Sequence, residues 1–242
     1  MKRSLREMEK KFRVYVWGDK GLTAILILFL LSAFIAPLIN FNFARILIGL
    51  LFSALLLSGV SSVSVRLLPR AAAGLLVGTT IVTHWLHDIY VFPILDFCAV
   101  FLSLLCFLLL TVVILKQVFQ DGAVTVAKIK GAVAVYILIG FSWSYIYQLI
   151  VLRVPEAFNL PHLLTNPGDI RHSADLTYFS FVTLTTLGYG DITAAHPISR
   201  MFVIIEALIG QLYPATLLAR LVSLEIVHRE KHQAGKKTDK VP

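Results

Sequence analysis

The sequence has 242 residues, of which 57% are hydrophobic and only 15% are charged, and its mean hydropathy is +0.81. Soluble domains contain about 45–50% apolar and about 25% charged residues, so this composition excludes soluble enzymes, disordered chains and disulfide-rich scaffolds. It predicts a membrane protein, and the apolar stretches described next predict an all-α fold. The formal net charge is +8, and its distribution along the chain decides what it means.

Six stretches with few charged residues are long enough to cross a membrane as helices, which takes about 20 residues. In chain order they are 21–44, 46–65, 71–87, 97–115, 131–152 and 201–219. The first follows a basic segment but exceeds the apolar core of a signal peptide, so we expect a retained span. The third is the shortest. At its outer end His84, His87 and Asp88 form either a metal- or proton-sensing cluster or a polar helix end at the membrane interface.

The basic residues indicate which way the chain crosses the membrane. Most of the 22 Lys and Arg residues lie before the first span, after the second and fourth spans, and from Arg220 onward. The positive-inside rule therefore places both termini in the cytoplasm. The expected location of the protein is a plasma or inner cell membrane. The positive charge reflects this topology and contact with anionic lipid of the inner leaflet, and no nucleic-acid partner is expected.

A short apolar segment on the outer side, between the fifth and sixth spans, leads into Thr186-Leu187-Gly188-Tyr189-Gly190. It is too short to span the membrane and predicts a re-entrant loop. Backbone carbonyls of such a loop can replace the water shell of a potassium ion. Two glycines at alternate positions permit the left-handed backbone that turns successive carbonyls to one side.

This pentapeptide closely resembles the selectivity-filter signature Thr-Val-Gly-Tyr-Gly of the tetrameric P-loop potassium channels of the six-transmembrane type. The specific resemblance covers roughly residues 128–226. It implies that the permeant K⁺ is held at Thr186, Leu187, Gly188 and Tyr189. Because one chain has one such loop and a ring of carbonyls needs four, a homotetramer is expected.

The segment from about Ala174 to Thr185 is expected to form the pore helix that enters from outside. Ser173 is a candidate N-cap and Asp175 suits the positive end of the helix. By resemblance, Tyr178 and Phe179 stand where voltage-gated relatives have two tryptophans, and Val182 stands where some relatives have a buried glutamate. The residues assigned to filter support are Tyr178, Phe179, Val182, Thr185, Asp191 and Glu206.

Glu206 lies within the sixth span, where an ionisable group is costly and seldom faces lipid. One hypothesis is that it stabilises the pore helix or filter, through Ser180, Thr183 or Thr185, in place of the acid missing at Val182. The alternative is a protonated contact between helices with no role in conduction.

Gly210 and Pro214 follow in the same span. The resemblance makes Gly210 a gating hinge, and Pro214 should kink the helix because it removes a backbone hydrogen bond. Ordinary packing in a membrane helix is the alternative for each, since both residue types are frequent there.

Voltage-gated relatives have regularly spaced arginines in the fourth span, but residues 95–115 contain Asp96 and no base. We therefore expect weak or no voltage dependence. The expected organisation is a basic cytoplasmic segment (1–20), a four-helix domain without gating charges (21–115), an interfacial linker helix broken near Gly122 (116–130), the pore domain with an irregular outer turret at 153–172 (131–226), and a disordered cytoplasmic tail (227–242).

The pattern favours a potassium-selective channel that conducts passively and needs no cofactor. A secondary cation transporter and a non-conducting subunit with a channel-like fold are the alternatives. No hydrolytic or redox constellation is visible, so an enzyme is not expected. The opening stimulus, an accessory subunit and the packing of the four-helix domain against its own or a neighbouring pore are not readable from the residues.

Overall fold

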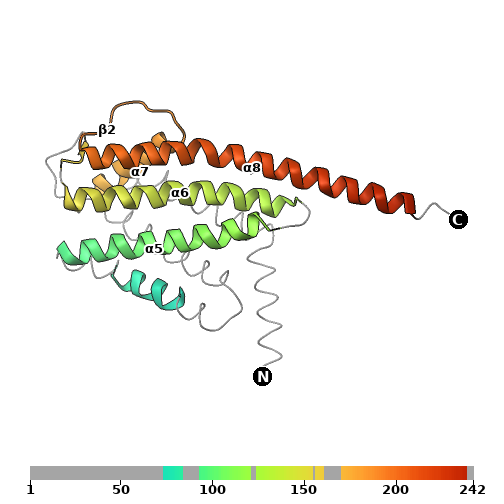
Figure 1. The fold of residues 1–242 in the computed structure, drawn as a ribbon. Helices are drawn as coiled ribbons and strands as arrows, with labels where there is room; N and C mark the ends of the chain where they lie inside the picture. The colour runs from blue at the N-terminus through green and yellow to red at the C-terminus, as the bar shows by residue number, and fades with distance from the viewer. Residues whose placement is uncertain (1–72, 84–92, 121–123, 155, 161–169, 239–242) are drawn as a thin grey trace, which may run out of the picture.

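The computed structural model describes residues 73–83, 93–120, 124–154, 156–160 and 170–238 (Figure 1). The helical segment Ala73–Thr83 comes first. It is followed by α5 (Pro93–Val118), α6 (Val126–Arg153), β1 (Phe158–Asn159), α7 (Ile170–Leu184), β2 (Thr193–Ala194) and α8 (Pro197–Thr238). The first two expected spans, and the cluster of His84, His87 and Asp88, lie outside the described residues. The described part is almost wholly helical, as the long apolar stretches predict.

Three helices of the described part are long and apolar enough to cross a membrane: Ile94–Val118, Val126–Arg153 and Pro197–Leu224. They contain the expected fourth, fifth and sixth spans. Ala73–Thr83, which lies within the expected third span, is a shorter apolar helix. The apolar helices support an integral membrane protein.

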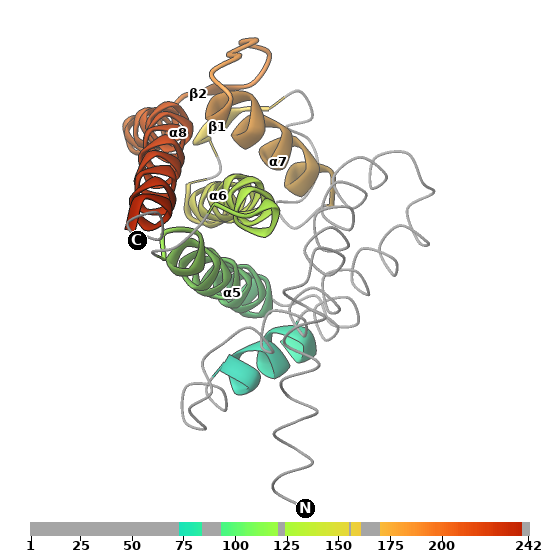
Figure 2. The ribbon, with the colours of Figure 1, turned by 90° about the vertical axis from the view of Figure 1, so that its right-hand side faces the viewer.

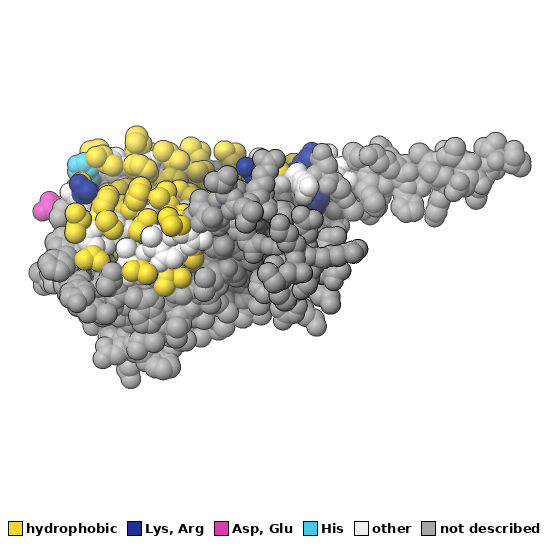
Figure 3. All heavy atoms as spheres, turned by 90° about the horizontal axis from the view of Figure 1, so that it is seen from below, with side chains coloured by type: hydrophobic (Ala, Val, Ile, Leu, Met, Phe, Trp, Pro, Cys, Tyr) yellow, Lys and Arg dark blue, Asp and Glu magenta, His cyan; other side chains and the backbone are white. Residues whose placement is uncertain are grey.

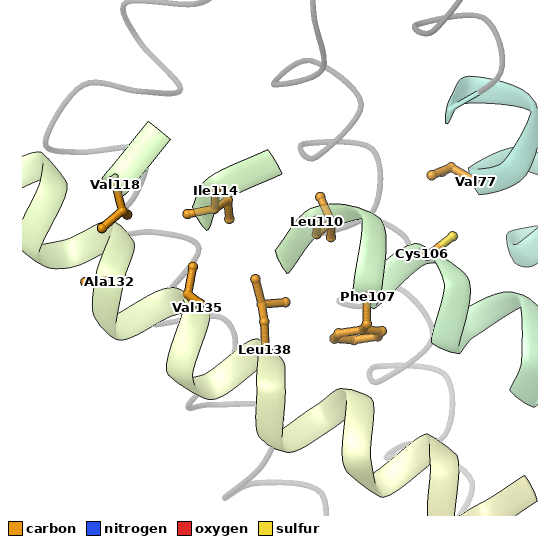
Figure 4. Close-up of a cluster of buried hydrophobic side chains, with 9 residues drawn as sticks. All are labelled: Val77, Cys106, Phe107, Leu110, Ile114, Val118, Ala132, Val135 and Leu138. Carbon is orange, nitrogen blue, oxygen red and sulfur yellow. The ribbon is translucent and has the colours of Figure 1, made fainter. Parts of the chain in front are cut away.

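α5 and α6 pack side by side along a cluster of buried apolar residues (Figure 4). Its members are Val77, Cys106, Phe107, Leu110, Ile114, Val118, Ala132, Val135 and Leu138. The separate linker helix expected at 116–130 is not present in the described residues, because α5 continues to Val118 and α6 begins at Val126. Thr125 starts α6 as an N-cap, since its hydroxyl accepts a hydrogen bond from the Lys128 amide.

α6 occupies the centre of the described part, with α5 on one side and α7 and α8 on the other (Figure 2). A second buried cluster joins α6 and α7 to the segments on either side of α7. Its members are Trp143, Tyr147, Val151, Ala157, Phe158, Leu160, Leu176, Phe179 and Ile192. The pore-helix segment is thus held against α6 by large aromatic side chains rather than by a loop alone.

A two-stranded antiparallel pairing closes the outer end of this region. Phe158 of β1 lies opposite Ala194 of β2, and Asn159 lies opposite Thr193. The carbonyl of Ala157 accepts bonds from the Ala195 amide (2.9 Å) and from the Ser199 hydroxyl (2.7 Å). Residues 153–172 were expected to be an irregular turret; Phe158–Asn159 form a short strand there, and residues 161–169 lie outside the described residues. Such a brief pairing leaves no alternating sequence pattern to detect.

α8 continues through Pro214 and extends to Thr238, well beyond the other helices in Figure 1. The tail from residue 227 was expected to be disordered, and the structure corrects this, because its backbone is helical to Thr238. Residues 227–238 contain no proline, and seven of these twelve residues are Arg, Glu, Lys, Gln or Ala, which are good helix formers.

One face of α8 is apolar and exposed in the single chain. Met201, Ile204, Leu208 and Leu212 are each more than half exposed, and they recur at the helical spacing of three or four residues. Figure 3 shows apolar side chains over much of the described surface in that view, with charged side chains toward its ends. Lipid or another protein surface must cover such a face.

Candidate functional site

The pore-helix segment starts earlier than the sequence indicated. α7 begins at Ile170, so Ser173 is not its N-cap and Asp175 is not in its first turn. The Ser173 carbonyl instead accepts a bond from the Thr177 hydroxyl at 2.7 Å within the helix. A capping side chain contributes only about 1 kcal/mol, which does not prevent a helix from beginning one turn upstream.

α7 ends in a Schellman motif that leads directly into the candidate filter. The Leu187 amide donates to the Val182 carbonyl at 2.9 Å, and the Thr186 amide donates to the Thr183 carbonyl at 2.9 Å. Thr186 takes the left-handed position that usually belongs to glycine, with φ of 59°. A side chain there costs roughly 1–2 kcal/mol, so Thr186 stores local strain where the chain leaves the helix.

The candidate filter has positive φ at every second residue: 59° at Thr186, 59° at Gly188 and 78° at Gly190. The sequence predicted left-handed backbone at the two glycines, and the structure has it there and at Thr186 as well. A Cβ added at Gly188 or Gly190 would meet nothing within 4 Å in this chain. Backbone conformation, not lack of space, therefore favours glycine at these two positions.

Leu187 and Tyr189, the residues between these three, point away from the body of the chain. Leu187 is 59% exposed and Tyr189 is 68% exposed. Most of each side chain is therefore left uncovered within one chain. The loop between α7 and β2 arcs clear of the helices (Figure 2).

The carbonyl of Leu184, the last residue of α7, is held from two sides. The Tyr136 hydroxyl of α6 donates to it at 3.0 Å. On the other side α8 approaches so closely that a Cβ on Gly210 would lie 2.8 Å from the Leu184 carbonyl carbon. The tyrosine satisfies one of the carbonyls that a helix end leaves without a partner. Gly210 is therefore required by the contact between α7 and α8, whether or not the helix bends there.

Glu206 is fully buried where α6, α7 and α8 meet. Its Oε2 accepts a hydrogen bond from the Tyr147 hydroxyl of α6. Its Oε1 lies 2.6 Å from the Ser180 hydroxyl of α7, and that hydroxyl lies 2.7 Å from the carbonyl of Gly140. Ser180 is one of the three partners that the sequence suggested for this acid. Thr183 is buried and Thr185 donates to the Phe181 carbonyl at 2.6 Å.

The two aromatic residues of the pore helix have different surroundings. Phe179 is buried and packs against the rings of Tyr147 and Phe158, with centroid separations of 5.4 and 5.3 Å. Tyr178 is exposed and donates to Asp191 at 2.8 Å, which links α7 to the residue that follows the candidate filter. This bond lowers the pKa of Asp191 below its ordinary value and raises the pKa of Tyr178.

The sequence reasoning missed Tyr136, Tyr147 and Gly140, all on α6. Nothing distinguishes these residues locally, because tyrosine and glycine are ordinary in membrane helices. Their partners Leu184, Glu206 and Ser180 belong to segments remote in sequence. The buried acid was the available signal, since it needs donors from a neighbouring helix.

Comparison with known proteins finds sequence similarity in the part of the chain that contains α7 and the candidate filter. Residues 161–225 match the sequence model of a family described as ion channel. Over 83 residues the chain is 45% identical to a protein named two pore potassium channel c, from Oryza sativa subsp. japonica. That match covers 33% of this chain and only 18% of the rice protein. No solved structure gives a significant match.

These findings support a membrane protein with an ion channel region, similar over part of its length to a potassium channel. The likeness is to channels and not to an enzyme. The matched residues contain α7, the segment with alternating φ, and the part of α8 that contacts α7.

Proposed function

We propose that this protein is a potassium-selective channel that conducts K⁺ passively through a pore shared by four copies of the chain. The alternating φ from Thr186 to Gly190 is the observation that carries the proposal. That alternation allows consecutive carbonyls to face one axis, where they substitute for the water around a potassium ion. K⁺, the permeant substrate, would be held by Thr186, Leu187, Gly188 and Tyr189.

The surface of the single chain supports assembly into a homotetramer. Leu187 and Tyr189 are exposed large side chains beside the candidate filter, and α8 presents an exposed apolar face. One loop supplies a quarter of a closed ring of carbonyls, and cyclic symmetry closes the ring with identical copies. Neighbouring copies would then cover the two filter side chains. Both termini would lie on the cytoplasmic side of a cell membrane. Anionic lipid of the inner leaflet would contact the basic residues of the protein on that side.

The channel would not be gated by voltage. α5, which contains the expected fourth span, has Asp96 near its start and Lys116 near its end as its charged residues. Without a row of arginines, no described charge of this helix would move through the membrane field.

The roles of the other residues follow the contacts described above. Tyr178, Phe179, Val182, Thr185 and Asp191 would support the filter from the pore helix and its outer end. Glu206 would support the filter from α8 through Ser180, as the hydrogen bond between these two residues favours. Gly210 and Pro214 would set the path of α8 and any bend that opens the pore.

Flux from purified protein in liposomes tests the proposal. The protein should pass K⁺ and exclude Na⁺, and Gly188→Ala should lower the K⁺ flux because an alanine side chain disfavours a φ of +59°. Gly78→Ala is the matched control: an added Cβ at either position meets nothing within 4 Å, but Gly78 is helical.

The alternatives give different results in the same assay. A secondary transporter would accumulate K⁺ against its gradient when a second ion gradient is supplied. A non-conducting subunit would show no flux with or without Gly188→Ala. Chemical cross-linking of the purified protein in detergent should reach four chains, and a smaller limit would contradict the shared pore.

A further inference from the structure

The oxygen atoms around Glu206 form a chain that joins three helices. It runs from the Tyr147 hydroxyl to the two carboxyl oxygens of Glu206, then to the Ser180 hydroxyl, and ends at the Gly140 carbonyl. Tyr147, Ser180 and Glu206 are buried, with Ser180 and Glu206 both 0% exposed. Water therefore does not supply hydrogens to this chain, and the protein's own groups must do so.

The hydrogens can be counted. Tyr147 supplies one, which goes to Oε2 of Glu206. Ser180 has one hydroxyl hydrogen but two oxygens close to it, the Glu206 Oε1 at 2.6 Å and the Gly140 carbonyl at 2.7 Å. A carbonyl oxygen only accepts, and an ionised carboxylate also only accepts. An ionised Glu206 would thus leave one of these two short contacts without a hydrogen.

We propose that Glu206 is a neutral carboxylic acid whose Oε1 hydrogen is donated to Ser180, which leaves the Ser180 hydrogen for the Gly140 carbonyl. Every polar atom in the chain is then satisfied. Glu206 is a positioning residue: it fixes Ser180, and through Ser180 it fixes the pore helix against α6 and α8. This extends the proposed filter support by assigning the state of the acid that provides it.

The surroundings agree with a neutral acid. Among the described residues, the titratable groups that face Glu206 are Tyr147 and Tyr136 of α6, and α7 presents the uncharged Ser180. Neither tyrosine offers a positive charge, and no ion pair joins Glu206 to a described residue. An unpaired carboxylate buried at this point would cost far more than a hydrogen-bonded neutral acid.

Loss of the Glu206 hydrogen at alkaline pH would change two interactions together. The carboxylate would become an unpaired buried charge, and it would take the Ser180 hydrogen away from the Gly140 carbonyl. The pore helix would lose the hydrogen bond between Ser180 and the Gly140 carbonyl of α6. If the channel function holds, K⁺ flux falls at alkaline pH by about tenfold for each pH unit beyond the midpoint, as the loss of one proton requires.

Glu206→Gln is the decisive variant, because the glutamine amide donates to Ser180 and its carbonyl accepts from Tyr147 at every pH. It should fold, and the ratio of its flux at alkaline pH to its flux at neutral pH should stay near one, whereas this ratio falls in the wild type. The control is Glu156→Gln, which replaces an exposed glutamate and should keep the wild-type profile. A Glu206→Gln protein whose flux falls at alkaline pH as in the wild type would overturn the proposal. If the variant does not fold, the infrared band of the wild type decides the state of Glu206.

Infrared spectroscopy of the purified protein separates this inference from the channel function. The wild type at neutral pH should show the C=O band of a protonated carboxylic acid, and Glu206→Gln should lack it. If the band is present but no K⁺ flux is found, the state of Glu206 stands and the channel function fails. If the band is absent, the inference fails whatever the flux.

Discussion

Gly210 of α8 lies directly against the backbone carbonyl of Leu184, the last residue of α7. A Cβ at position 210 would lie 2.8 Å from the Leu184 carbonyl carbon and 3.0 Å from its Cα. Both atoms belong to backbone, which cannot move aside as the end of a flexible side chain can. The junction between the pore helix and the candidate filter therefore depends on the absence of a side chain on another helix.

Gly210→Ala should lower the free energy of unfolding by about 1–3 kcal/mol or more, because the new methyl group overpacks the contact between α7 and α8. Thermal unfolding of the purified protein measures the change. Gly78→Ala provides the comparison: it should be neutral or slightly stabilising, since alanine is favoured over glycine by about 1 kcal/mol in a helix. Equal stability of the two variants would show that Gly210 is not confined as described.

Tyr136→Phe should leave the Leu184 carbonyl without its donor and destabilise the end of the pore helix by about 1–3 kcal/mol. Tyr213→Phe is a matched control, because the Tyr213 hydroxyl also donates to a helix carbonyl, that of Ala132, at 2.9 Å. Both variants should lose stability. Only Tyr136→Phe should also change the ratio of K⁺ to Na⁺ flux, and a similar change in Tyr213→Phe would contradict the specific role of Leu184.

The bond between Tyr178 and Asp191 should contribute to stability in a pH-dependent way. Because the bond lowers the pKa of Asp191 in the folded protein, its contribution is present above the ordinary aspartate pKa and is lost as pH falls through the lowered value. A double-mutant cycle with Tyr178→Phe and Asp191→Asn should show coupling at neutral pH. The coupling should disappear in acid, and coupling that grows in acid would have the wrong sign.

Steady-state conductance should vary little with membrane voltage. Each gating charge that crosses the field contributes about 2.3 kcal/mol per 100 mV, and α5 has no arginine to supply one. Recordings from planar bilayers over a wide voltage range provide the measurement. A steep conductance curve equivalent to several moving charges would show that voltage is sensed elsewhere in the chain.

Several features could be read from the residues because they depend on neighbours in sequence. The alternating backbone follows from Gly188 and Gly190, and the three candidate spans follow from long apolar stretches. Local signals were less reliable at helix ends. Ser173 was a candidate N-cap, but α7 starts at Ile170. One capping side chain contributes less free energy to the helix than the backbone hydrogen bonds of another turn.

Glu206 shows what the sequence predicts by itself and what depends on the packing of the helices. Its position in an apolar helix was enough to predict that it needs hydrogen-bonding partners inside the protein, because lipid cannot provide them. Its actual partners, Tyr147 and Ser180, come from two other helices, and only the packing of α6, α7 and α8 brings them together. The contact of Gly210 with the backbone of Leu184 likewise depends on how α7 and α8 pack, and the resemblance indicated only a hinge at this glycine. Composition and spacing determine what each segment can do alone, but contacts between distant segments depend on how the helices pack.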